Sequence, residues 1–315
     1  MDDAMLRMVI TARAAARESA RRYGDVTSTL TRVRNLRHDD RSVAAMIDQT
    51  NMDAQLGARG AVPPSGRFPP YTPSPAEQYV ASRQLEIDYD LSNALPNSSN
   101  GVYVARDRDS GVLFIYKPFD EEKFGNIDWI PHTPGQLAIR DVLGYRVFEM
   151  MRAPLVPPTA LVDGPFGPGS SQLYVPMKYS KYARDFPEEQ GLQAAAGHSL
   201  IGNADGRTAN FRPKHDGNDD ASPNDELVLY DHSESFPEDA DPRRGNKGFE
   251  SYSAFARYYD GSDLPPSVLD PLKAITDDRI GSAAEDLKLS DNAIDRTLER
   301  LHELQSTGEI SSVWS

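Results

Sequence analysis

Residues 200–236 read LIGNADGRTANFRPKHDGNDDASPNDELVLYDHSESF, and the rest of the chain is interpreted outward from this stretch. Asp205 stands in an Asn-Ala-Asp-Gly turn, and Asn210 follows it by five residues. After a polar loop comes the apolar run Leu-Val-Leu-Tyr at 227–230, which ends at Asp231. A short apolar run that closes on a carboxylate is typical of a buried strand that carries one charge to its exposed end.

The spacing of these polar residues indicates a chemistry. An Asp followed five residues later by Asn, and then by an Asp at a strand end, is the arrangement that kinases use for phosphoryl transfer. An Asp-Gly turn alone is more often only a turn, because Asp caps its own backbone and Gly adopts positive φ. The chemical interpretation is favoured because the other parts of a kinase site appear upstream in the right order.

A strand that ends in lysine stands upstream of that stretch. Residues 85–89 alternate between apolar and polar, and residues 102–104 and 112–117 are two further runs of strand formers. Lys117 closes the last run, where its ammonium group could reach nucleotide phosphates or could only extend from a sheet edge into solvent. Residues 96–101, Pro-Asn-Ser-Ser-Asn-Gly, predict a loop that either covers phosphates or serves as an ordinary turn.

A helix that could hold Lys117 is predicted for residues 135–151, because apolar side chains recur there along one stripe at helical spacing. Its candidate acids are Asp141 and Glu149. Asp141 lies nearer the apolar stripe at about 100° per residue, so we expect Asp141 rather than Glu149 to pair with Lys117.

The remaining segments predict a helical second half. Residues 156–162 and 171–176 predict a strand pair joined by a glycine- and proline-rich turn, and the second strand occupies the place of a kinase hinge. Helices are expected at 191–201, 252–259, 265–275 and 290–303, the last with Ser290 as N-cap.

The N-terminal part differs in composition. Residues 1–57 predict helices, and residues 58–76 contain six prolines, which is typical of an extended linker. We therefore expect three parts: a helical extension with a Pro-rich linker (1–76), a β-rich lobe (77–175) and a helical lobe (176–315). Arginines at four-residue spacing in the first helix predict a solvated face or, less commonly, a docking surface for a protein partner.

Composition excludes several classes of function. The 315 residues include no cysteine, so disulfides, thiolate catalysis and zinc–thiolate sites are excluded. No apolar run approaches 18 residues and no signal peptide is recognisable, so we expect no membrane span and a cytoplasmic location, with delivery into another cell as an effector left open. The net charge of −14 argues against nucleic-acid binding.

The order of these motifs resembles that of the phosphatidylinositol 3- and 4-kinase-related proteins of actinobacteria and, more distantly, of the HipA-type atypical kinases. The resemblance covers residues 83–306, and its motifs are SSNGVYVA, FIYKP, IRDVLGYRVFEMM, VPPTALVDGPFGPGSSQLYV, NADGRTAN and YDHSESF. It implies an α+β, two-lobed, protein-kinase-like fold preceded by the N-terminal helical extension, and an activity that uses ATP with Mg²⁺ or Mn²⁺.

The resemblance also implies a role for each matching residue. These residues are Ser98, Ser99, Asn100 and Gly101 as the phosphate loop, Lys117 as the phosphate-binding lysine with Asp141 as its partner, Tyr174 and Val175 as the hinge, Asp205 as the catalytic base, and Asn210 and Asp231 as metal ligands. The family usually has Glu where this chain has Asp141, which shortens the reach of the ion pair by one methylene. Residues 177–190 depart from the family pattern, so the resemblance assigns no acceptor site.

The function expected from the sequence is therefore an Mg-ATP-dependent phosphotransferase that acts on a hydroxyl of a protein or small molecule. Two alternatives remain open: nucleotidyl transfer on the same scaffold, and a nucleotide-binding effector, toxin or interaction module without turnover. The joint presence of Asp205, Asn210 and Asp231 favours turnover.

Overall fold

The computed structural model describes residues 66–93, 95, 100–178, 181–215, 222, 224–238 and 249–314. The chain divides into two compact units, Met1–Gly57 and Ala58–Ser315, and the described residues all belong to the second. The helices expected within residues 1–57 lie outside the described residues. Within the described part, no helix is long and apolar enough to cross a membrane.

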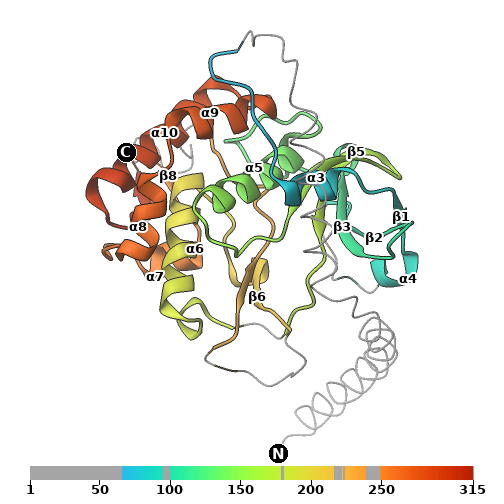
Figure 1. The fold of residues 1–315 in the computed structure, drawn as a ribbon, viewed down its shortest axis with the longest axis horizontal. Helices are drawn as coiled ribbons and strands as arrows, with labels where there is room; N and C mark the ends of the chain where they lie inside the picture. Colours follow the sequence, from blue (N-terminus) through green and yellow to red (C-terminus); the bar gives the residue numbers. More distant parts are fainter. Residues whose placement is uncertain are drawn as a thin grey trace, which may run out of the picture. The chain divides into compact units, whose positions relative to one another are not determined.

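A five-stranded antiparallel sheet forms one lobe (Figure 1). The strand order is β1-β2-β3-β5-β4, so the hairpin partners β4 and β5 extend the β1–β3 meander through the pairing of β3 with β5. The strands are β1 (Leu85–Ile87), β2 (Tyr103–Asp107), β3 (Leu113–Pro118), β4 (Thr159–Gly164) and β5 (Gly167–Leu173). Helix α3 (Pro75–Ala81) packs against β4 and β5, and a 3₁₀ turn η1 (Phe119–Glu121) follows β3.

The strand expected at residues 85–89 is shorter than predicted. It ends at Ile87, and a single helical turn, α4 (Tyr89–Ser92), follows. The cause is Asp88, whose carboxylate accepts a hydrogen bond from the Leu91 N–H at 3.0 Å and so caps this turn.

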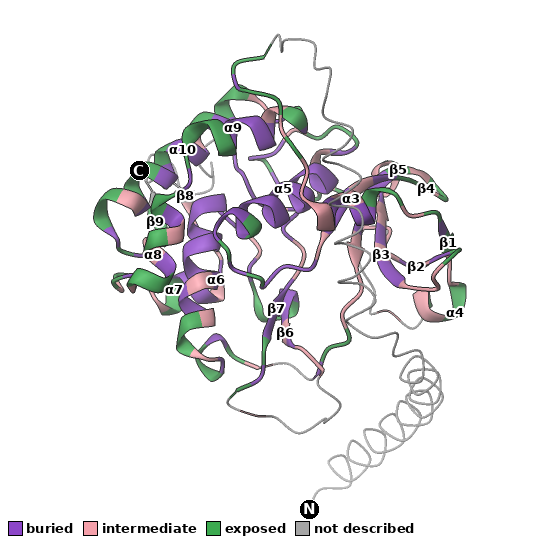
Figure 2. Ribbon diagram, in the orientation of Figure 1, coloured by how far each residue is buried: buried purple, intermediate pink, exposed green. Residues whose placement is uncertain are grey.

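Helix α5 (Gln136–Met150) is the central element of the described residues. It packs against β4 and β5 on one side and against α6 and α9 on the other (Figure 1). All of its residues except Gln136 and Glu149 are buried, as the purple colour of α5 in Figure 2 shows. The apolar side chains expected to form a stripe are buried as predicted, but burial extends around the whole helix because both lobes cover it.

The second lobe is mainly helical. Its helices are α6 (Glu188–Ile201), α7 (Ala254–Tyr258), α8 (Pro266–Lys273), α9 (Asp277–Asp286) and α10 (Asp291–Thr307), with 3₁₀ turns η2 (Ala183–Asp185) and η3 (Thr208–Asn210). Two short antiparallel pairs complete it: β6 (Phe211–Pro213) with β7 (Leu227–Leu229), and β8 (Phe249–Glu250) with β9 (Val313–Trp314). Ser290 caps α10 as predicted, because its hydroxyl accepts a hydrogen bond from the Ala293 N–H at 3.2 Å.

The large hydrophobic core lies in the helical lobe and includes α5. It joins apolar side chains of α5, α6, α8, α9 and α10, with Phe68 from the segment that precedes α3. The N–H groups of Arg67 and Phe68 donate to the carboxylate of Glu285 at 2.8 and 3.2 Å. Residues 66–74, which we expected to belong to the linker, thus contact α9 and α10 directly. The α+β fold with a β-rich lobe and a helical lobe, expected from the sequence, is confirmed.

Candidate active site

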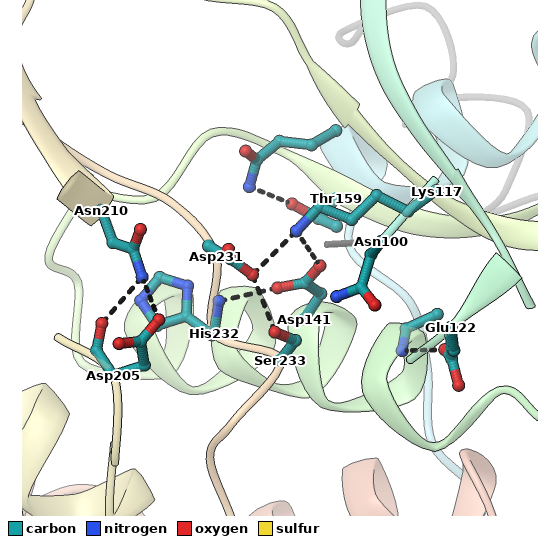
Figure 3. Close-up of polar contacts among 12 residues, drawn as sticks. Asn100, Lys117, Glu122, Asp141, Thr159, Asp205, Asn210, Asp231, His232 and Ser233 are labelled. Carbon is teal, nitrogen blue, oxygen red and sulfur yellow. Dashed lines mark hydrogen bonds and ion pairs between the residues drawn. The ribbon is translucent and has the colours of Figure 1, made fainter. Parts of the chain in front are cut away.

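Lys117 lies between two carboxylates that come from distant parts of the chain (Figure 3). Its Nζ is 2.8 Å from Asp141 Oδ2 on α5 and 2.9 Å from Asp231 Oδ1, which follows β7. The other oxygen of Asp141 accepts a hydrogen bond from the His232 N–H at 2.7 Å. Glu149, the alternative acid, instead accepts a hydrogen bond from Tyr145. Asp141 therefore connects the lysine of the sheet with the backbone next to Asp231.

Lys117 and Asp231 stabilise each other's charge, whereas burial and the charge of Asp231 raise the pKa of Asp141 despite Lys117. Burial lowers the pKa of the Lys117 amine, but Asp141 and Asp231 together raise that pKa above the usual range of lysine. Burial raises the pKa of Asp231, yet Lys117 and the hydroxyl of Ser233 outweigh it and hold the pKa of Asp231 well below its usual range. Lys117 is therefore protonated and Asp231 ionised at neutral pH. Asp231 is the more accessible carboxylate, with a side chain 36% exposed against 6% for Asp141.

The backbone at Asp231 explains why its side chain turns into the site. Its φ is 60°, in the left-handed region that Asp adopts more readily than most residues. The preceding Tyr230 N–H donates to the Asn210 carbonyl at 3.1 Å, so β7 is held beside the loop that carries Asn210. Asp231 follows directly after this contact.

Asp205 is fixed by contacts on several sides. Helix α6 ends at Gly202, which has φ 59°, and the side-chain oxygen of Asn203 accepts a hydrogen bond from the Asp205 N–H at 2.8 Å. Asn210 Nδ2 donates both to the Asp205 carbonyl at 2.7 Å and to its carboxylate at 3.0 Å. Arg207 Nε lies 2.8 Å from the other carboxylate oxygen. Burial raises the pKa of Asp205, although Arg207 and Asn210 oppose this effect.

The donor set fits a divalent cation. Asn210 uses its amide nitrogen on Asp205, and Figure 3 shows its amide oxygen turned away from Asp205. Carboxylate and amide oxygens are the ligands that Mg²⁺ prefers. Asp231 and Asn210 supply one of each, on neighbouring segments joined by the Tyr230–Asn210 hydrogen bond. Among the described residues, no group of three or more His, Cys, Asp or Glu side chains could hold a metal ion, so substrate oxygens would have to complete the shell.

Part of the expected phosphate loop can be placed. Ser98 and Ser99 lie outside the described residues. The side-chain oxygen of Asn100 accepts a hydrogen bond from the Lys123 N–H at 2.7 Å, and the Gly101 N–H donates to the Glu121 carbonyl at 3.3 Å. A Cβ at Gly101 would stand 2.0 Å from Glu121 Oε2 and 2.7 Å from Glu121 Cβ, so a larger residue would displace the Glu121 side chain. The structure thus attaches the end of the loop to the segment that follows β3.

The expected hinge residues connect the sheet with the helical lobe. Tyr174 and Val175 follow β5 directly, and the Tyr174 N–H donates to the Leu113 carbonyl at 3.0 Å. Further along, the Pro176 carbonyl accepts a hydrogen bond from the His215 N–H at 2.8 Å, next to β6. The segment therefore links the two lobes, and the Tyr174 N–H is engaged within the sheet.

Two residues that sequence reasoning missed support the site. Arg207 holds the Asp205 carboxylate, and its place two residues after Asp205 was the only sequence signal. Glu122 accepts hydrogen bonds from the Gly135 and Ala138 N–H groups, both at 2.8 Å. It thereby caps the N-terminus of α5, whose own N-cap residue is a glycine without a side chain to do so. No spacing rule links Glu122 to a helix 13 residues away.

Comparisons with known proteins find similar structures but no similar sequences. No protein-family model matches the chain, and no curated protein matches it. One similar structure is the crystal structure of a Helicobacter pylori proinflammatory kinase, CtkA, with a TM-score of 0.46 and 9% sequence identity. The match covers 72% of the present chain and 93% of the CtkA chain. The crystal structure of the golgi casein kinase is 12% identical with a TM-score of 0.46 and covers 74% of this chain and 75% of its own. The described residues of the present chain form a β-rich lobe and a mainly helical lobe.

Proposed function

We propose that this chain is an atypical kinase, a phosphotransferase that uses ATP with Mg²⁺ or Mn²⁺ and transfers a phosphoryl group to a hydroxyl of a protein or small molecule. The observation that carries the proposal is the Lys117–Asp141–Asp231 cluster, which brings together a sheet lysine, an acid of the central helix and an acid that follows a strand. Asp205 and Asn210 lie on the neighbouring segment and supply the two further polar groups that the proposal requires.

In this proposal each side chain of the site has a separate role. Lys117 neutralises phosphate charge, and Asp141 keeps its ammonium group in place. Asp231 and Asn210 would hold the divalent cation, which supplies further neutralisation of phosphate charge when bound. The Asp205 carboxylate accepts the proton of the acceptor hydroxyl, while a new oxygen–phosphorus bond forms and the bond between the γ-phosphorus and the β–γ bridging oxygen breaks, so that ADP leaves.

The finer parts of the proposal rest on the sequence. The motifs from SSNGVYVA to YDHSESF support membership in the actinobacterial phosphatidylinositol 3- and 4-kinase-related, HipA-like group. Ser98, Ser99, Asn100 and Gly101 would cover the phosphates, and Tyr174 and Val175 would line the adenine pocket. We further propose a cytoplasmic location, no nucleic-acid partner in view of the net charge of −14, and a protein partner for the helices expected within residues 1–57.

The test is label transfer from two forms of ATP. The chain is incubated with Mg²⁺ and either γ-labelled or α-labelled ATP, and covalent label is followed by mass spectrometry on the chain itself and on candidate acceptors. Transfer from the γ position that is lost in Asp205→Asn supports the proposal. Transfer from the α position would identify nucleotidyl transfer instead. Asp270→Asn, a change of an exposed carboxylate on α8, is the matched control and should retain full transfer.

A further inference from the structure

The residues that follow helix α10 support the loop that carries Asp205. We call residues 311–314 the tail strand. Within it, β9 pairs with β8, with Glu250 opposite Val313, and the Ser251 N–H donates to the Ser312 carbonyl at 2.7 Å. The Ser199 hydroxyl of α6 donates to the Ser311 carbonyl at 2.8 Å. The tail strand thus holds residues 249–251 beside the last turn of α6.

Ser251 connects the tail strand with the loop that contains Asp205. Its hydroxyl donates to the Asn203 carbonyl at 2.8 Å, and the Asn203 side chain accepts the Asp205 N–H at 2.8 Å. Ser251 is fully buried and Asn203 is 2% exposed, so water does not compete for these bonds. On the other side of Asp205, the Gly206 carbonyl accepts a hydrogen bond from the Ala254 N–H at 2.8 Å. The chain on both sides of Asp205, at Asn203 and at Gly206, is therefore tied to residues 251–254.

The packing around these bonds leaves little freedom. The Ser253 hydroxyl caps α7 by accepting the Ala256 N–H at 3.1 Å and lies 2.6 Å from His198 Nδ1. A Cβ at Gly206 would stand 2.8 Å from the Ser253 Cα and 3.0 Å from His198 Nδ1. The backbone at Gly206 therefore lies directly against this serine and this histidine. A shift of residues 251–254 would consequently shift the loop that carries Asp205.

We propose that the tail strand is a positioning element for Asp205, acting through Ser251 and Asn203. Its kinetic consequence rests on the proposed function, because Asp205 is the proton acceptor there. The contacts reach the Asp205 loop and not Lys117 or Asp141, whose partners come from β3, α5 and the residues after β7. Loosening the tail strand should therefore slow turnover and leave nucleotide affinity unchanged.

An exposed residue offers the cleanest test. Asp260 lies at the surface, and its carboxylate accepts the Ser312 N–H at 2.7 Å. Asp260→Ala removes this anchor, whereas Asp260→Asn keeps an acceptor oxygen and serves as the conservative rescue. Asp270→Ala is the control, because the Asp270 side chain makes no hydrogen bond or ion pair with any residue that the structure describes. Ser251→Ala tests the inner link of the same path.

Three readouts are measured on the full chain: amide hydrogen exchange of peptides spanning residues 200–212, Mg·ATP affinity by calorimetry, and kcat from γ-label transfer. Asp260→Ala and Ser251→Ala should speed exchange in that peptide and lower kcat on the order of tenfold at unchanged nucleotide affinity. Asp260→Asn and Asp270→Ala should match the wild type in all three.

The proposal is overturned if Asp260→Ala speeds exchange at residues 249–254 and leaves both the 200–212 peptide and kcat unchanged. A loss of nucleotide affinity equal to the loss in kcat would also overturn it, because it would indicate general loosening of the lobe. If the wild type transfers no label, the proposed function fails, and the exchange measurement still decides the positioning role. If Ser251→Ala does not fold, Asp260→Ala decides it alone.

Discussion

At the scale of single residues, the different surroundings of Asp231 and Asp205 indicate different chemical roles. Asp231 is ionised beside Lys117 and is partly open to solvent, which suits a ligand of a cation. Asp205 is paired with Arg207, and burial raises the pKa of Asp205 although Arg207 partly offsets this rise. A carboxylate with a raised pKa is the better proton acceptor, because its affinity for a proton is higher.

Exchanging each carboxylate for its amide should separate these roles. Asp231→Asn should weaken Mg·ATP binding itself, because the cation loses a charged ligand. Asp205→Asn should leave binding nearly intact and lower turnover on the order of 10²–10⁴-fold, the usual contribution of a general base. Calorimetry and label transfer on both variants, with Asp270→Asn as control, give the answer. Loss of binding in Asp205→Asn together with full activity in Asp231→Asn would mean that the roles are reversed.

Arg207 should set the acid side of the pH profile. Asp205 must be ionised to accept a proton, so the rate falls as pH drops through its pKa. Burial raises that pKa and Arg207 lowers it, so Arg207→Ala should raise it further. The acid limb of kcat should then move to higher pH, with the alkaline side unchanged. Arg279→Ala, which removes an exposed arginine on α9, should leave the profile in place. A shift toward lower pH would contradict the assignment.

The candidate site residues that the sequence singles out differ in a physical way from the supporting residues that it does not. Lys117, Asp141, Asp205, Asn210 and Asp231 were recognisable because each ends a strand, lies on a patterned helix or follows at a fixed spacing. Their mutual distances were not predictable, because they depend on how the two lobes meet. Glu122 and Ser251 were not found because they act through backbone groups distant in sequence, and a glutamate or serine in a loop has no pattern that marks such a contact.

At the scale of elements, α5 joins the two lobes and carries Asp141. Its position depends on Glu122, whose carboxylate accepts two N–H groups of its first turn. Burial raises the pKa of Glu122, whereas these backbone donors oppose the rise. The amide of Gln has one acceptor oxygen and no charge, so it replaces this cap only in part.

Glu122→Gln should therefore weaken both the fold and nucleotide binding. The lost cap should cost about 1 kcal/mol of unfolding free energy, or about 2–4 °C in melting temperature. Mg·ATP should bind more weakly, because Asp141 on the loosened helix holds Lys117 less firmly. Glu189→Gln, a change of an exposed acid in the first turn of α6, is the matched control. If Glu122→Gln melts and binds like the wild type, α5 does not depend on this cap.

Helices and strands were predicted correctly where the local sequence pattern agreed with the packing around the element in the structure. The β3 strand and α10 with its Ser290 cap are formed much as expected. Helix α9 was not predicted, because its sequence DDRIGSAAED has few large apolar residues. In the structure this helix is stabilised by packing against α5 and α10. The apolar stripe on α5 is buried as expected, but the near-complete burial of this helix was not predicted, because apolar periodicity shows only one face.

At the scale of the whole chain, the division into parts 1–76, 77–175 and 176–315 stays a prediction. The compact unit that contains the site begins at Ala58, and residues 66–74 are attached to the helical lobe. Arg67 lies 2.6 Å from Asp295 of α10, and Ser74 caps α3. The compact unit that contains the site therefore includes part of the Pro-rich segment.

Phe68 is the strongest of these attachments. Its side chain is 8% exposed and belongs to the main core, and a Cβ at Gly281 of α9 would stand 2.4 Å from its ring. A larger residue at 281 would therefore displace the Phe68 ring. Truncating a buried Phe to Ala costs about 3–5 kcal/mol, from lost burial and the cavity left behind.

Three changes should rank in order of stability, measured by thermal unfolding with and without Mg·ATP. Deleting residues 1–57 should leave the melting temperature and nucleotide binding unchanged, because no residue of the site precedes residue 98. Phe68→Ala in the full chain should lower the melting temperature on the order of 10 °C, and deleting residues 1–76 should lower it at least as much. Phe166→Ala, at an exposed phenylalanine of the β4–β5 turn, is the control and should change the melting temperature little.

A large loss of melting temperature on deleting residues 1–57 alone would show that the first unit stabilises the second. Equal stability of the two deletions would show that residues 66–74 contribute nothing to it.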